Sequence, residues 1–366
     1  QYALHEDSVD EAAPDGRTLN RDGFTLRRAR LRTRWERGFS RGLLELDAGT
    51  HREIPVTPRR VEATVEPWPW LVATAGLTRP PFGAELPLGN EARIFLERTA
   101  ASQAFFPGET DLGAVVSGAA GPLRWSIALM NGAPAEDGHL PYAEDPASAH
   151  DLIGRLGLRL QGDGLVLDVG TSYLTGEGLH EGVPATKSGV TWSDLDEDSV
   201  IDTGELSPQA ARAATPSKAF DRWAVGADTR LDFETPIGVT TLEGEVILAT
   251  NLDRSGEAAD PILRGFDQRS LAATASAVHA WRGVLVGFRW ETFAPDLDLT
   301  ESRRGGQVPV DRGSTTYSPL VGYAWAETWR LVAQYDHVVD TRGRDVRGVP
   351  VDLANDVFVL RLQAGP

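Results

Sequence analysis

Four arginines alternate along one short stretch of the chain. Residues 26–35 read LRRARLRTRW, and Arg28, Arg30, Arg32 and Arg34 occupy every second position. A period of two is typical of a β-strand, so the four guanidinium groups lie on one face of the strand and apolar side chains lie on the other. A guanidinium group stays charged and binds oxyanions through two parallel hydrogen bonds. These four residues, here called the ladder, therefore predict a strand face that attracts small anions.

Carboxylates on the segments that follow give the ladder a structural alternative. Glu45 and Asp47 fall on the corresponding face of the next alternating segment, and Glu62 and Glu66 fall on that of the one after it. These acids could neutralise the ladder by ion pairing. The sequence leaves both roles open, and the two are compatible with each other.

A second set of charged residues lies in DLDEDSVIDTGE (194–205). Its spacing is that of a calcium-binding loop, in which carboxylates and one backbone carbonyl provide the ligands. The predicted ligands are Asp194, Asp196, Asp198, Val200, Asp202 and Glu205. Ser199 stands where such a loop usually has glycine. The alternatives are a structural calcium site and an acidic, solvated loop that holds no metal.

The composition limits the classes of protein to which the chain can belong. It has 366 residues, a formal net charge of −17 and no cysteine. Disulfides and zinc–thiolate sites are therefore excluded, and the negative charge argues against a nucleic-acid partner. No run of apolar residues approaches the roughly 18 that a membrane-spanning helix needs. No pair of nucleophile and base stands out, so we expect no enzymatic activity.

Alternating segments recur from end to end, and the connections between them alternate in length. The pattern predicts sixteen strands, most of them close to the roughly 9–11 residues that cross a bilayer as tilted β-strands. Tight turns alternate with long polar loops. The long loops are predicted at 8–22, 50–58, 79–111, 132–150, 174–218, 252–269, 294–316 and 339–354. Because all of them then lie at one end, the pattern favours an all-β, antiparallel up-and-down barrel in an outer membrane, with residues 1–366 as a single domain.

Energetics indicates which face of the strands meets the lipid. An arginine that faces lipid at the midplane costs about 2–4 kcal/mol, and four on one strand would cost several times that. The ladder must therefore face water inside the barrel, and a barrel of about sixteen strands encloses an aqueous channel. Phe24 and Leu26 share the parity of the ladder, so we expect a bulge near Arg27.

A protein of a different class remains as an alternative. A soluble, calcium-dependent binding or adhesion protein could also contain many β-strands. Its apolar strand faces would then form a core inside the barrel, whereas a membrane barrel turns them outward. The position of the apolar faces discriminates between the two classes.

Four stretches, in their order along the chain, resemble the phosphate-selective porin family of the O and P type. They are FTLRRARL (24–31), GLTRPPFGAE (76–85), FLERTAASQAFFPGETDLGAVVSG (95–118) and LMNG (129–132). The resemblance covers most of the N-terminal half and implies a sixteen-stranded, homotrimeric porin of the bacterial outer membrane. It also implies that the third loop folds into the barrel and that anions follow an arginine ladder to a basic central site.

Segment 79–111 would be that constriction loop. It carries Arg79, Arg93 and Arg98 beside Glu85, Glu91 and Glu97, around apolar Ile94, Phe95 and Leu96. A connection of this length is rarely idle, and its apolar patch needs a surface on which to pack. We expect this packing to hold Arg93 and Arg98 at the narrowest point of the lumen.

The sequence thus predicts a passive outer-membrane channel for small anions, phosphate among them. The anion path is predicted to consist of the ladder together with Arg79, Arg93 and Arg98. A general diffusion porin without preference for anions is the alternative within the same class.

Overall fold

The computed structural model describes most of the chain. The described residues are 1–5, 22–48, 56–89, 92–132, 150–193, 200, 206–255, 258–303, 306–325, 328–344, 349–353 and 355–364. Among these residues, no helix has the length and apolar character needed to cross a membrane.

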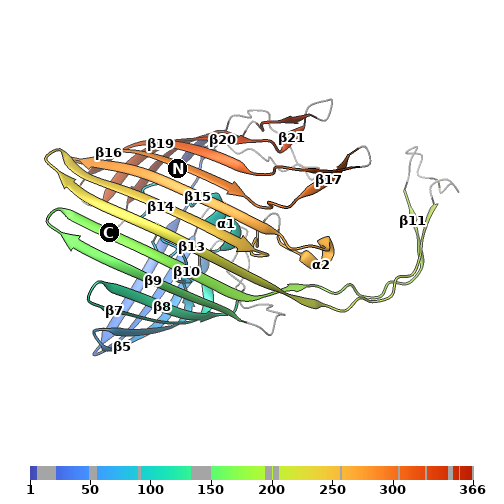
Figure 1. Ribbon diagram of the computed structural model, residues 1–366, viewed down its shortest axis with the longest axis horizontal. Coiled ribbons are helices and arrows are strands. Elements are labelled where there is room, and N and C mark those ends of the chain that lie inside the picture. Colours follow the sequence, from blue (N-terminus) through green and yellow to red (C-terminus); the bar gives the residue numbers. More distant parts are fainter. Residues whose placement is uncertain are drawn as a thin grey trace.

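One antiparallel sheet of seventeen strands forms the wall of a barrel (Figure 1). Its strands are β1 (Tyr2–His5), β2 (Gly23–Phe24), β3 (Ala29–Arg37), β4 (Ser40–Ala48), β5 (Val56–Trp68), β6 (Leu71–Thr78), β7 (Asp111–Ala120), β8 (Leu123–Met130), β9 (Asp151–Gly162), β10 (Leu165–His180), β13 (Lys218–Thr235), β14 (Gly238–Thr250), β15 (Arg269–Trp281), β16 (Val284–Ala294), β19 (Ser314–Trp325), β20 (Trp329–Asp340) and β23 (Val357–Ala364). From β3 onward each strand pairs with the next strand of the wall.

The order of strand pairing returns to its start. The short strand β1 pairs with β23 on one side and with β2 on the other. Because β2 leads into β3 through residues 25–28, these two count as one interrupted strand. With β2 and β3 counted as one strand, the seventeen strands of the sheet become sixteen, the number predicted from the sequence.

Residues 25–28 are the irregularity predicted near Arg27. Leu26 points outward and is 52% exposed. Arg27 and Arg28 are adjacent in sequence, yet both form ion pairs with Glu97 inside the barrel. Two successive inward side chains break the alternation of a regular strand, as a bulge does.

Tight turns and long connections lie at opposite ends of the barrel, as predicted (Figure 1). Between β15 and β16, for example, Arg282 and Gly283 have φ angles of 48° and 87°. These values suit a two-residue hairpin turn whose twist matches that of the strands, and glycine adopts them without strain.

The long connections contain regular structure that the sequence analysis did not predict. They include the helices α1 (Ala100–Phe105) and α2 (Pro261–Arg264) and three two-stranded hairpins. The hairpins are β11 (Gly189–Trp192) with β12 (Leu206–Gln209), β17 (Thr300–Arg303) with β18 (Gly306–Pro309), and β21 (Gly343–Arg344) with β22 (Pro350–Val351). Loop 174–218 is also shorter than predicted, because β10 continues to His180 and keeps its backbone groups paired with β13.

The apolar faces of the strands lie on the outside of the barrel. Leu31, Ile127, Leu156 and Leu362 are 65%, 55%, 50% and 55% exposed. Arg155, on the opposite parity to Leu156, forms an ion pair with Asp228 across the inner face. This arrangement contradicts the soluble alternative, which requires the apolar faces to form a core inside the barrel.

Candidate functional site: the constriction of the barrel

The connection between β6 and β7 lies inside the barrel, and strands from several sides of the wall hold it there. The Gly83 N–H donates to Ser172 Oγ of β10 over 3.0 Å. The Leu96 N–H donates to Gln334 Oε1 of β20 over 2.9 Å, and the Ala100 N–H donates to Glu291 Oε1 of β16 over 3.3 Å. The prediction that segment 79–111 folds into the lumen is confirmed, except that its last residue, Asp111, begins β7.

Apolar contacts seal this constriction loop against one part of the wall. The loop contributes Phe82, Leu86, Phe105 and Phe106, and β8 to β16 contribute Met130, Ile153, Leu174, Ile247 and Phe293. A second cluster joins Phe95 and Leu96 of the loop to Val278, Leu285, Leu320, Val332 and Val359 of β15 to β23. Inward apolar side chains are exceptional in a water-filled barrel, and those of the two clusters lie where the loop covers them.

The ladder lies on the remaining part of the wall, on β3 and just before it. Arg30 lies 3.3 Å from Glu45 and 3.4 Å from Asp47, and Arg32 lies 2.7 Å from Glu45. Arg34 is exposed and has no ion-pair partner among the described residues. The structural alternative for the ladder therefore holds for Arg30 and Arg32, whereas Arg34 forms no such pair within the described part of the chain.

The other two acids considered as partners of the ladder bind elsewhere. Glu62 accepts two hydrogen bonds of 2.8 Å from Arg60 of its own strand. Glu66 lies 3.3 Å from Arg41. Arg60 and Arg41 share the inward parity of these acids, but parity does not indicate which arginine each acid meets.

The three arginines of the constriction loop surround one carboxylate, that of Glu109. Arg93, Arg98 and Arg79 lie 3.3, 3.5 and 4.0 Å from it. Burial raises the pKa of Glu109, but Arg93, Arg98 and Arg79 outweigh this effect and hold the pKa well below its usual range. Arg98 also donates to the carbonyl oxygens of Ser102 and Phe106. This network fixes the fold of the loop.

The geometry of Arg93 and Arg98 differs from the sequence prediction, which placed them in contact with passing anions. Their exposed fractions are 8% and 7%, so both guanidinium groups are buried within the loop. The reason is Glu109, which the prediction did not consider. A buried arginine needs a partner, and Glu109 is the carboxylate nearest to both.

The tip of the loop carries a cluster in which several arginines share one carboxylate. Glu97 lies 3.1 Å from Arg27, 3.5 Å from Arg28 and 2.6 Å from Arg361. Burial raises the pKa of Glu97, and the charges of Arg27, Arg361 and Arg28 more than offset it, lowering this pKa to about 2. Arg361 belongs to the last strand, so Glu97 also links the two ends of the sheet.

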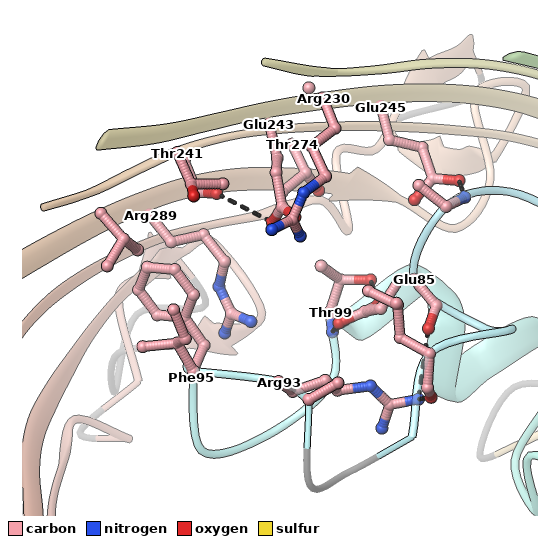
Figure 2. A pocket seen from close by; sticks show the side chains of 17 residues that line it. Glu85, Arg93, Phe95, Thr99, Arg230, Thr241, Glu243, Glu245, Thr274 and Arg289 are labelled. Carbon is pink, nitrogen blue, oxygen red and sulfur yellow. Dashed lines mark hydrogen bonds and ion pairs between the residues drawn. The ribbon is translucent and has the colours of Figure 1, made fainter. Parts of the chain in front are cut away.

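Between the loop and β13 to β16 lies a cavity whose lining carries mixed charge (Figure 2). On the wall, Arg230 lies 2.6 Å from Glu243. The guanidinium group of Arg289 lies over the ring of Phe95, 4.9 Å from its centroid. Glu85 of the loop accepts a hydrogen bond of 2.7 Å from the Thr99 hydroxyl. With three arginines and three glutamates in its lining, this side of the lumen is less basic than the tip of the loop.

The predicted calcium loop falls largely outside the described residues. Of its six predicted ligands only Val200 is described, with an exposed fraction of 57%. Glu91 of the constriction loop also lies outside the described residues. Within the described part of the chain, no group of three or more acidic or histidine side chains could hold a metal ion.

Comparisons with solved structures show what the barrel is similar to. The trimer form of OmpT, an outer membrane protein of Vibrio cholerae, matches with a TM-score of 0.55 and 10% identity over 99% of this chain and 95% of that chain. OmpF of Salmonella typhi, solved with daunomycin, matches with a TM-score of 0.56 and 8% identity over 99% and 94%. The fold is that of bacterial outer-membrane porins. An anion-selective porin from Comamonas acidovorans matches with a TM-score of 0.50 and 9% identity over 92% and 89%.

No family model matches the chain, and no curated protein matches it either. The porin fold predicted from the sequence is confirmed by the solved structures. The finer resemblance, to phosphate-selective porins, is not confirmed by these comparisons.

Proposed function

We propose that the protein is a passive channel of the bacterial outer membrane that favours small anions. The observation that carries the anion preference is the Glu97 cluster, where one carboxylate faces the guanidinium groups of Arg28 and Arg361, with Arg27 beside them. One negative charge cannot neutralise this cluster, so the tip of the loop is positively charged. The porin fold, which this chain shares with a porin described as anion-selective, supports the proposal.

The course of the loop suggests the path that anions take. Apolar clusters pack the loop against the wall from β8 to β23, and the cavity that remains between the loop and β13 to β16 has equal numbers of arginines and glutamates in its lining. The ladder side of the lumen instead presents charged groups, of which Arg32 is 32% exposed at its side chain and Arg34 is exposed. Water and ions therefore pass along β3 to β5, with Arg34 near the end of the tight turns and Arg28 near the loop.

Replacing Arg34 by glutamine is expected to lower the ratio of anion to cation permeability about fourfold, because the energies of the anion and the cation shift in opposite directions. A unit charge about 10 Å from the ion path in water changes the energy of an ion by about 0.4 kcal/mol. The measurement is the reversal potential of a planar bilayer under a chloride gradient. Arg269→Gln is the matched control, because Arg269 shares the outward parity of Leu271 and its side chain is 57% exposed. Equal reversal potentials for Arg34→Gln and the unaltered protein would refute the proposed path.

A general diffusion channel without anion preference is the second candidate. Arg30 and Arg32, which the sequence analysis assigned to the anion path, are paired with Glu45 and Asp47. If charge along the ladder is compensated throughout, the reversal potential under a chloride gradient will stay near zero. The same bilayer experiment thus decides between the two candidates.

Among small anions, phosphate is the solute that we propose the channel prefers. Guanidinium groups bind phosphate oxygens through paired hydrogen bonds, and Arg28 and Arg34 offer such groups along the path. Phosphate added to one side should then reduce the chloride current at concentrations at which sulfate does not. The proposed assembly is a homotrimer in outer-membrane lipid, by analogy with OmpT, whose structure is described as a trimer.

Calcium binding by residues 194–205 remains a separate proposal that rests on spacing alone. The expected affinity is weak, roughly 10⁻⁴–10⁻³ M, as in extracellular calcium modules. Calorimetry should detect the binding heat in the unaltered protein and lose it in Asp196→Ala. Identical heats for the two proteins would favour the acidic loop without a metal.

A further inference from the structure

The connection after β14 turns into the mouth of the barrel. Asn251 follows the strand with a φ of 54°, a left-handed conformation that asparagine tolerates. Its side-chain amide donates to the backbone oxygen of Asp221 and to Asp267 Oδ1, which fixes the turn. Leu252 comes next and is fully buried among the apolar side chains that hold the constriction loop. The turn brings Arg254 to helix α1.

Arg254 contacts the C-terminal end of α1 in three ways. Its backbone N–H donates to the carbonyl oxygen of Ala104 over 2.9 Å, and its Nη1 donates to that of Phe105 over 3.4 Å. Its guanidinium group lies over the ring of Phe106, 5.6 Å from the centroid. The last carbonyl groups of a helix have no partner within the helix, so a donor with positive charge stabilises this end.

The same guanidinium group is anchored to the wall. Its Nη2 donates to Asp151, which is 1% exposed. Asp151 also accepts a hydrogen bond of 3.0 Å from Arg222 of β13, and Arg222 donates to the carbonyl oxygen of Gly132 over 2.9 Å. Arg254 therefore joins α1 to β9 and β13 through a buried chain of charged groups.

We propose that Arg254 is a positioning residue of the constriction. By holding α1 against β9 and β13, it sets the width of the passage on the ladder side. Its side chain is 11% exposed, so it acts through the position of the loop and does not itself attract ions. The inference rests on the proposed channel function and assigns part of the constriction to a second loop, the one between β14 and β15.

Hydrogen exchange together with single-channel recording tests this role. In Arg254→Gln, the amides of residues 99–106 should exchange about tenfold faster, because one charged hydrogen bond stabilises the docked loop by roughly 1.4 kcal/mol. Single channels should fluctuate among several current levels, while the reversal potential stays unchanged. Arg254→Lys should restore part of the protection.

Two further variants keep the test decisive. Asp151→Asn weakens the contacts of Asp151 with Arg254 and Arg222 but leaves Arg254 in place, and it should produce the same faster exchange, even if Arg254→Gln does not fold. Arg264→Gln is the matched control: it lies in the same connection, 2.9 Å from Asp296, and should behave like the unaltered protein.

Unchanged exchange at residues 99–106 in both Arg254→Gln and Asp151→Asn would overturn the inference. So would a shift in reversal potential as large as that of Arg34→Gln, because it would place Arg254 in the ion path. If the unaltered protein conducts no ions, the proposed function fails. Faster exchange in the variants would then still show that Arg254 positions the loop.

Discussion

Replacing Glu97 by glutamine will raise the ratio of anion to cation permeability about tenfold. The change removes the one carboxylate shared by Arg27, Arg28 and Arg361 at the tip of the constriction loop. A unit charge about 6 Å from the ion path in water changes the energy of an ion by about 0.7 kcal/mol, and the opposite shifts for an anion and a cation together correspond to that factor. The reversal potential under a chloride gradient measures the effect, whose direction is opposite to that of Arg34→Gln.

Asp298→Asn is the control for this variant. Asp298 pairs with Arg269, the residue of outward parity used as the control for Arg34, and its side chain is 35% exposed. The control therefore removes one carboxylate away from the proposed ion path. A permeability ratio that stays the same or falls in Glu97→Gln would show that the cluster lies away from the path, and the Glu97 argument for anion preference would be lost.

The same variant should also be less stable. The side chains of Glu97 and Arg27 are 28% and 31% exposed, so removing the carboxylate of this half-buried cluster costs about 1–3 kcal/mol, because the remaining charges lose their partner. Here the loss falls where the two ends of the sheet meet, since Arg361 lies on β23 and Arg28 lies just before β3. A lower unfolding temperature of the detergent-solubilised protein would report it.

The stability of this cluster should depend on pH in acid. The pKa of Glu97 is lowered to about 2 in the folded protein, against an ordinary value of 4.5. A carboxylate with a depressed pKa contributes stability that is fully present above its unfolded value and is lost as the pH falls toward the folded value. The difference in unfolding temperature between the unaltered protein and Glu97→Gln should therefore shrink between pH 4.5 and pH 2.

The strands, their parity and the alternation of turns and loops were predictable because they depend on local patterns. Lipid accepts apolar side chains and excludes arginine, so the order of side chains along 26–35 alone determines which face is inside. The bulge near Arg27 followed from the same rule, because Leu26 breaks the parity of the ladder. These features need no knowledge of distant residues.

The partners of the charged side chains were less predictable, because they join residues far apart in the chain. Arg361 reaches Glu97 across 264 positions, and Arg254 reaches Asp151 across 103. Parity indicates that such groups point inward, but it does not indicate which carboxylate each arginine meets. Arg93 and Arg98 illustrate this, since a nearby acid, Glu109, removed them from contact with water.

Deleting residues 86–94 will roughly double the single-channel conductance and weaken the anion preference, since the narrowest section of a pore limits both its current and its selectivity. The deletion removes Leu86, which is 3% exposed in the apolar cluster under the loop. It also removes Arg93, one of the partners of Glu109. The shortened segment can no longer span the lumen from β10 to β20, so Phe95 and Glu97 are drawn away from β23.

Two variants separate the geometric effect from a loss of charge. Arg93→Gln removes the positive charge of Arg93 alone, whereas the deletion also removes Glu91 and leaves the net charge unchanged. The substitution keeps the length of the loop, so it should affect conductance far less than the deletion. Phe82→Ala removes an apolar contact of the loop and should have an intermediate effect, because Phe82 is 2% exposed in the same cluster. A deletion variant with unchanged conductance and selectivity would place the loop outside the ion path, because ions that avoid the loop are insensitive to its removal.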